Sequence, residues 1–160
     1  MWQRRLSPIV LVLWLLSGVS GAGASTGDAY EPDDSAADAR TIWSLNPSAV
    51  LTGLPAAVAK EVPQHHSIHQ ANDVDWLLFY AVGHDWHEIR VTPEAATLDL
   101  KIELYEDQGT RLLASSDWNF AGQSETLSYR LDGDSRWLWI RISAVNYVDS
   151  GQPQAYSVVV

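Results

Sequence analysis

Hydrophobic and polar residues alternate with a period of two over several short segments in the C-terminal two thirds of the chain. The clearest is 98–105, in which every second residue is aliphatic and those between are mostly charged. Such alternation puts successive side chains on opposite faces, so this segment is predicted to be a strand with one buried face. Segments 88–92 and 126–131 follow the same pattern, whereas 74–82 is nearly all apolar and aromatic, which is typical of a strand buried on both faces. A closing strand is predicted over 156–160.

The segment 137–143 is also predicted to be a strand, and its two faces differ in chemistry. One face is aliphatic, with Leu138, Ile140 and Ile142. The other carries the candidate ligand-binding residues, Trp137, Trp139 and Arg141. If the aliphatic face points into the core, the second face lies outside, where such side chains can bind sugars, peptides or a partner protein. Alternatively, a neighbouring loop such as 54–64 covers both tryptophans, which then only fill space.

Turn-forming residues separate the predicted strands. The segments 107–109 (Asp-Gln-Gly) and 132–134 (Asp-Gly-Asp) are typical turn sequences, and 111–115 is predicted to return from the first of them as a strand. Ahead of the strands, 35–42 is rich in small residues and is predicted to form one helical turn. Seven or eight short strands with turns between them indicate an all-β, jelly-roll-like β-sandwich of antiparallel strands, with one short N-terminal helical turn.

The first 24 residues have the pattern of a secretory leader. Two arginines precede a short apolar run, 9–16, and Ala22-Gly23-Ala24 offers a small-residue cleavage site. The apolar run is short for a bilayer span, and a retained membrane anchor is the competing interpretation. The chain is therefore divided into a signal peptide, 1–24, and a single domain, 25–160, with no membrane span after cleavage. The predicted location is the periplasm or the external medium.

The composition of the chain limits the kinds of molecule that it can bind. The formal net charge is −10, and removal of the two leader arginines makes it more negative. An acidic surface repels nucleic acid and anionic membranes and suits divalent cations or basic partners. The chain has no Cys, which excludes disulfides and a thiol nucleophile. An exported domain of this size must then be held by its core, with or without a metal.

Two acidic clusters are the candidate metal ligands. One lies at 30–35 (Tyr-Glu-Pro-Asp-Asp-Ser), and the other lies at 73–76 (Asp-Val-Asp-Trp), directly before the most apolar strand. Calcium takes several oxygen ligands, and Asp73 and Asp75 project to the same side of an extended segment. The two clusters therefore indicate a calcium site near the start of the sandwich. The alternative is that the first cluster caps the helical turn and the second only forms a turn.

Four motifs follow one another along the chain after the leader. They are YEPDDS at 30–35, HSIH at 66–69 running into DVDW at 73–76, LKIELYED at 100–107, and LWIRI at 138–142 before the closing YSVVV at 156–160. Together they resemble bacterial pre-peptidase C-terminal domains. These are β-sandwich modules appended to secreted proteases, and the collagen-binding domains of clostridial collagenases are their relatives.

This resemblance implies both a metal site and a binding face. In the collagen-binding relatives, residues of the two acidic segments hold calcium. Carried over to this chain, the ligands of a structural calcium ion are Glu31, Asp33, Asp34, Asp73 and Asp75. The family commonly has Asn at the position of Asp33, and both residue types offer an oxygen. Aromatic residues on a strand face make the collagen contact in those relatives, and Trp139 falls at a comparable place.

The chain departs from the family pattern in two ways. The stretch 54–64 is longer than usual, and no protease domain precedes the module. A solitary exported module is therefore expected, and a role as an appendage to a catalytic domain is not carried over.

The histidines and the catalytic motifs give separate alternatives. The histidines that could form a zinc or copper site are His65, His66, His69, His84 and His87. No feature of the sequence brings the first three together with the last two, and a structural role at the strand entry explains His66 and His69. Residue 87 begins a zinc-protease motif that lacks its second histidine, and 122–125 is not the Gly-x-Ser-x-Gly motif of hydrolases. The chain is therefore predicted not to be an enzyme.

The sequence as a whole predicts an exported, non-catalytic binding module that is stabilised by calcium. Its aromatic strand face would contact an extracellular or envelope protein or a polysaccharide, and not nucleic acid. One alternative is a structural or chaperone-like accessory domain for an envelope or secreted partner. Another is an enzyme or inhibitor whose site has no recognisable motif. The sequence leaves the oligomeric state open.

Overall fold

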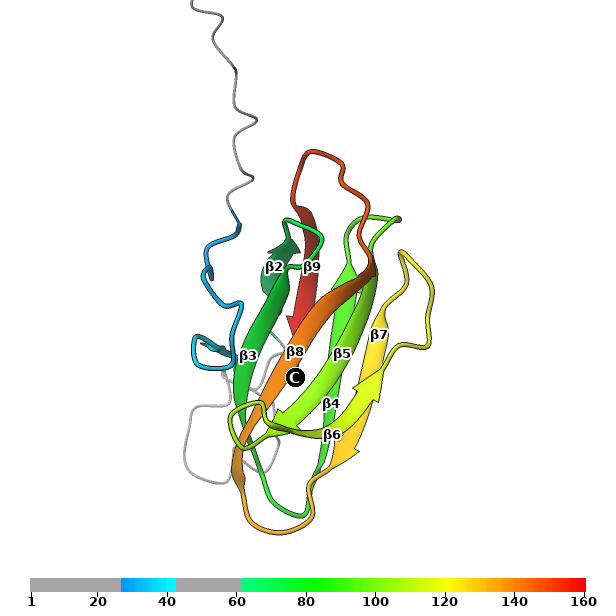
Figure 1. The fold of residues 1–160 in the computed structure, drawn as a ribbon. Helices are drawn as coiled ribbons and strands as arrows, with labels where there is room; N and C mark the ends of the chain where they lie inside the picture. Colours follow the sequence, from blue (N-terminus) through cyan, green and yellow to red (C-terminus); the bar gives the residue numbers. More distant parts are fainter. Residues whose placement is uncertain (1–26, 43–61) are drawn as a thin grey trace, which may run out of the picture.

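The computed structural model describes residues 27–42 and 62–160, which form two stacked β-sheets (Figure 1). In chain order the strands are β1 (Arg40–Thr41), β2 (Gln64–Ile68), β3 (Val74–Ala81), β4 (Trp86–Pro93), β5 (Asp99–Glu106), β6 (Arg111–Ser116), β7 (Glu125–Arg130), β8 (Arg136–Asn146) and β9 (Gln154–Val159). One sheet has the order β1-β3-β8-β5-β6, and the other has the order β2-β9-β4-β7. The predicted all-β sandwich is thus confirmed.

Two parts of the sequence prediction lie wholly or mostly outside the described residues. They are the signal peptide, 1–24, and the long stretch 54–64, of which only the last three residues are described. Within the described ranges, no helix is long and apolar enough to cross a membrane.

The middle of the larger sheet has the two faces that the alternation predicts. β3 pairs antiparallel with β8 from Val74 opposite Ser143 to Ala81 opposite Arg136, and β5 lies on the other side of β8. The inward-facing aliphatic residues of β5 and β8 are fully buried: Leu100, Ile102, Leu104, Leu138, Ile140 and Ile142. Burial of this much apolar surface is the main favourable contribution to folding.

The N-terminal part differs from the prediction of a helical turn. A single backbone hydrogen bond of 2.9 Å, from Asp38 N to Ser35 O, closes one turn, and the chain then enters β1. No helix forms among the described residues, because Arg40 and Thr41 pair in parallel with β3 instead. The prediction also missed β2, since its sequence, Gln-His-His-Ser-Ile, has no apolar alternation.

The N-terminal segment, 27–42, lies along the outer edge of β3 (Figure 1). Its backbone is joined to β3 at two places besides the β1 pairing: Trp76 N donates to Asp33 O at 2.9 Å, and Ile42 N donates to Leu78 O at 2.9 Å. The side chain of Arg40 donates to the carbonyl groups of Tyr30 and Pro32, which fixes the path of the segment. The acidic residues of 28–34 are thereby held against the start of β3.

Candidate metal centre

Side chains from three segments converge at the edge of the sandwich where the N-terminal segment meets β2 and β3. We call them the acidic cluster: Asp28, Glu31, Asp33, His66, His69, Asp73 and Asp75. The N-terminal segment supplies the first three, and β2 and the residue after it supply the histidines. Asp73 is the residue before β3, and Asp75 lies in β3. Within the cluster, three sets of three residues each bring their ligand atoms within 4.8 Å of one another.

The first set, Glu31, Asp33 and Asp75, offers only carboxylate oxygens. Asp33 and Asp75 are each 1% exposed, and one oxygen of each has no hydrogen-bond partner among the described residues. Calcium binds such oxygens, and an unpaired buried charge is unfavourable unless a counterion is present. The chemistry of this set therefore fits a calcium ion.

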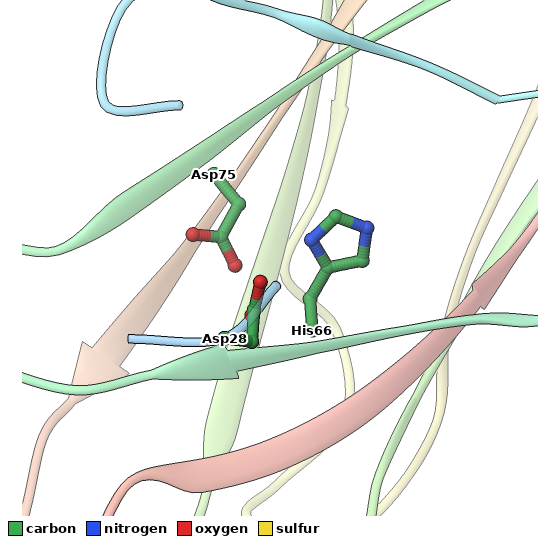
Figure 2. Close-up of side chains that lie close together, drawn as sticks. All are labelled: Asp28, His66 and Asp75. Carbon is green, nitrogen blue, oxygen red and sulfur yellow. The ribbon is translucent and has the colours of Figure 1, made fainter. Parts of the chain in front are cut away.

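The second set joins Asp28, His66 and Asp75. Figure 2 shows the carboxylates of Asp28 and Asp75 and the ring of His66 around a common space. His66 is 1% exposed, and its Nδ1 has no hydrogen-bond partner among the described residues. Asp75 is common to this set and the first, so the two sets are neighbours.

The third set, Glu31, His69 and Asp73, closes the loop between β2 and β3. His69 Nδ1 lies 2.6 Å from an oxygen of Asp73 and 3.0 Å from an oxygen of Glu31. The same Asp73 oxygen accepts the backbone N–H of His69 at 2.7 Å, and the hydroxyl of Tyr147 donates to the His69 carbonyl at 3.1 Å. These contacts attach Glu31, and with it the N-terminal segment, to the loop.

Burial disfavours the ionised form of the carboxyl groups in the acidic cluster. It raises the pKa of Asp75 to about 9, although the hydrogen bond from Tyr156 acts in the opposite direction. Burial, followed by repulsion from Glu31, raises the pKa of Asp33 to about 8. Burial also raises the pKa of Asp73 to about 6, against the hydrogen bond from the His69 backbone. A divalent cation would reverse these shifts, because an opposite charge favours the ionised carboxylate.

The same burial keeps the histidine of β2 neutral. It lowers the pKa of His66 to about 4, although the charge of Asp28 opposes the shift. The ring stacks on Tyr30, with centroids 4.3 Å apart, and on Tyr156, with centroids 5.7 Å apart. A neutral imidazole keeps a lone pair on one nitrogen, which is the form that binds metals.

Of the five residues predicted as calcium ligands, the structure brings four into the acidic cluster: Glu31, Asp33, Asp73 and Asp75. The fifth, Asp34, is exposed and belongs to none of the three sets of described residues. Adjacent residues of an extended segment point to opposite sides, so Asp33 and Asp34 do not both face inward. Asp28 was not predicted as a ligand, and His66 and His69 were considered only for a zinc or copper site, not as calcium ligands. A signal for one of them was present, because His69 lies only four residues before Asp73 in the sequence.

The outer face of the larger sheet carries the predicted aromatic residues. Trp137 is 44% exposed and packs edge-on against Tyr80, which is 49% exposed, with ring centroids 5.4 Å apart. Trp139 is half-buried. Arg141 donates to Glu103 Oε2 at 2.6 Å, so its charge is already paired. Of the three predicted contact residues, Trp137 is therefore the one with the most open surface.

The N-terminal segment covers the other half of this aromatic face. Trp139 Nε1 donates to the carbonyl of Ala36 at 3.1 Å. Gly109 has a φ of 79°, and a Cβ there would lie 2.8 Å from the Cβ of Ala36 and 2.9 Å from the Trp76 ring. The hairpin turn after β5 therefore packs closely on the residues around Ala36. A covering segment was one of the two alternatives for the tryptophans, and it applies to Trp139 but leaves Trp137 open.

Comparison with known proteins finds only distant likenesses among solved structures. No family model matches the sequence, and a search of curated proteins finds no match. Among solved structures, the pre-peptidase C-terminal domain of a collagenase from Bacillus anthracis matches with a TM-score of 0.48 and 11% identity, over 75% of this chain and 91% of that chain. The periplasmic inhibitor of g-type lysozyme from Aeromonas hydrophila, PliG, matches with a TM-score of 0.39 and 9% identity, over 75% and 95%.

The first of these structures is of the kind that the sequence motifs resemble. At such identities the likeness concerns the fold alone. It assigns neither an activity nor a ligand, and these have to be argued from the side chains of this chain.

Proposed function

We propose that this chain is an exported, non-catalytic binding module whose N-terminal segment is fixed by calcium. Its outer aromatic face would contact an extracellular or envelope protein or a polysaccharide. The observation that carries the proposal is the pair of exposed rings, Tyr80 and Trp137, which face each other across β3 and β8 and pack edge-on. Aromatic side chains give a large contact area for few rotatable bonds, which favours them as binding residues.

The proposed calcium ion would act on this face indirectly. Bound by Glu31, Asp33 and Asp75, it would link the N-terminal segment to β3. The residues around Ala36 belong to the same segment and cover Trp139. The ion would therefore set how much of the aromatic face is open, with the edge at Trp137 left free for the ligand.

The burial of the acidic residues favours a structural role over catalysis. Asp33, Asp73 and Asp75 are 1–2% exposed, so a substrate cannot reach their oxygens without opening the N-terminal segment. A general acid or base has to lie within hydrogen-bond reach of the reacting group. The acidic cluster is thus better suited to hold an ion than to turn over a substrate.

The net charge constrains the class of ligand. At −10 the chain repels polyanions, so the ligand would be a neutral polysaccharide or a protein with a neutral or basic surface. The guanidinium group of Arg141 is engaged by Glu103, and the contact would depend on ring stacking more than on charge.

Co-sedimentation with insoluble ligands tests this proposal. The panel is fibrillar collagen, peptidoglycan, cellulose and chitin, each with calcium present. We expect one class of ligand to pull down the wild type, and Tyr80→Ala with Trp137→Ala to remove at least nine tenths of the bound fraction. The matched control is Trp86→Ala, which removes a tryptophan that is 66% exposed on the other sheet.

Equal losses in the double variant and in the Trp86→Ala control would contradict the aromatic face as the contact. Unfolding of the double variant, seen by circular dichroism, would mean that the pair belongs to the core. A failure of every ligand to sediment the wild type would count against a binding module.

A further inference from the structure

The second set of the acidic cluster, Asp28, His66 and Asp75, has a donor that calcium does not use. Calcium in proteins is held by oxygen, whereas imidazole nitrogen suits zinc and its neighbours among the transition metals. A cluster of acidic residues alone does not define a site. The second observation here is His66, which is 99% buried, with Nδ1 directed into the cluster and without a hydrogen-bond partner among the described residues.

A chain of hydrogen bonds fixes which ring nitrogen carries the proton. The side-chain amide nitrogen of Gln64 donates to the carbonyl of Thr41 at 2.9 Å, so its amide oxygen must face the other way. That oxygen lies 3.3 Å from His66 Nε2 and can only accept, so Nε2 carries the hydrogen. The lone pair of the neutral ring is then on Nδ1, the nitrogen that faces the acidic cluster (Figure 2).

The two carboxylates are oriented in a similar way. Asp28 accepts the backbone N–H of Ser67 at 2.5 Å and that of Tyr30 at 2.8 Å. Asp75 accepts the hydroxyl hydrogen of Tyr156 on Oδ2, and its Oδ1 is left without a partner. Metal ligands in proteins are typically held by such outer contacts, which keep the donor atom pointed at the ion.

We propose that Asp28, His66 and Asp75 form a binding site for a transition-metal dication of the zinc class, which overlaps the oxygen-only calcium set at Asp75 and differs from it in the His66 nitrogen. Histidine nitrogen and aspartate oxygen are both zinc ligands. Asp33 Oδ2 has no partner and lies 3.7 Å from His66 Nδ1, which makes it the nearest candidate for a fourth ligand. The site would attach the start of the N-terminal segment to β2.

The test uses tag-free protein that has been stripped of metal. Isothermal titration calorimetry measures its affinity for Zn²⁺, and thermal unfolding with and without Zn²⁺ measures the midpoint temperature. We expect one Zn²⁺ per chain with a dissociation constant of 10 µM or tighter, and a rise of the midpoint by 5 °C or more. His66→Gln is expected to weaken zinc binding at least 30-fold. The matched control is His65→Gln, which changes the neighbouring histidine, whose side chain is 68% exposed, and should bind zinc as the wild type does.

The calcium proposal is tested separately in the same variants. His66→Gln should keep the midpoint shift produced by Ca²⁺, and Asp34→Asn, which changes an exposed carboxylate, should keep both shifts. If calcium has no effect while zinc binds through His66, the calcium proposal fails and the zinc site stands. If zinc binds equally well to His66→Gln, or not at all to the wild type, the zinc site is wrong.

A measurement on the wild type covers the case in which His66→Gln does not fold. In the Co²⁺-loaded protein, the Nε2 hydrogen of a coordinated histidine gives an exchangeable proton resonance that is strongly shifted by the paramagnetic ion. One such signal, lost when Zn²⁺ displaces Co²⁺, is expected. A Co²⁺ complex without this signal would overturn the assignment of His66 as a ligand.

Discussion

The inward face of β3 has two halves that are equally buried and chemically opposite. Leu77, Phe79 and Ala81 have no exposed surface and pack between the sheets. Asp75 points to the same side of the same strand and is 1% exposed, but it meets Asp33, His66 and Tyr156 instead. Inward and outward side chains alternate along the whole of β3. What changes along the strand is the inward residue, which is aspartate at its start and apolar after that.

This difference separates the part of the inward face that burial stabilises from the part that burial opposes. The aliphatic half is stabilised by burial itself, because removing apolar surface from water is favourable. The acidic half is opposed by burial, as the raised pKa values of Asp33 and Asp75 show. A protein with both halves should respond to ions at one end and not at the other.

The largest effect is expected from truncation in the aliphatic half. Ile140→Ala removes a fully buried side chain of β8 and should lower the free energy of unfolding by about 2–5 kcal/mol. Urea unfolding followed by tryptophan fluorescence measures the change, and the loss should be the same in EDTA and in calcium. The control is Val145→Ala on the same strand, where the side chain is 43% exposed and the loss should be far smaller. If the loss in the free energy of unfolding differed between EDTA and calcium, the aliphatic and acidic halves would be coupled, and the contrast between them would be wrong.

Removal of the ion should have the next largest effect, and it should act through the acidic half. With calcium at about a hundred times its dissociation constant, the free energy of unfolding should rise by about 2.7 kcal/mol over that in EDTA. Differential scanning calorimetry would show this as a shift of the midpoint on the order of 10 °C. Asp75→Asn, which keeps the shape of the side chain, should abolish most of the shift, and Asp34→Asn should leave it unchanged. A wild type that unfolds at the same temperature with and without calcium would contradict the calcium set.

The two halves also differ in how far the sequence predicts them. The alternation of 98–105 and 137–143 predicts β5 and β8, together with the face of each that is buried, because period two is a local property of the chain. The two acidic segments were also predicted to meet, and Asp33 and Asp75 do so. The sequence could not predict that His66 joins them, because β2 is polar and its inward side is decided by pairing with β9.

The smallest of these effects is a dependence of stability on pH in the metal-free protein. In the folded state, the pKa of Asp33 is raised to about 8 and that of Asp75 to about 9, from 3.8. The folded state then holds protons that the unfolded state has lost, so the free energy of unfolding must fall as the pH rises toward these values. With both groups contributing, the expected fall is about 2 kcal/mol per pH unit between about pH 7 and about pH 8. Urea unfolding in EDTA at several pH values measures it.

Above pH 6.5, the pH dependence of the stability reports the two carboxylates and not His66. The pKa of His66 is lowered from 6.5 to about 4, so this residue opposes the trend only at lower pH, where the unfolded state binds the extra proton. Calcium should flatten the slope, because an ion that binds the carboxylates holds them ionised in the folded state. Asp33→Asn should reduce the slope in EDTA by removing one of the two titrating groups. A stability that rises with pH in EDTA would mean that Asp33 and Asp75 are already ionised in the folded protein, and that the acidic half does not need an ion.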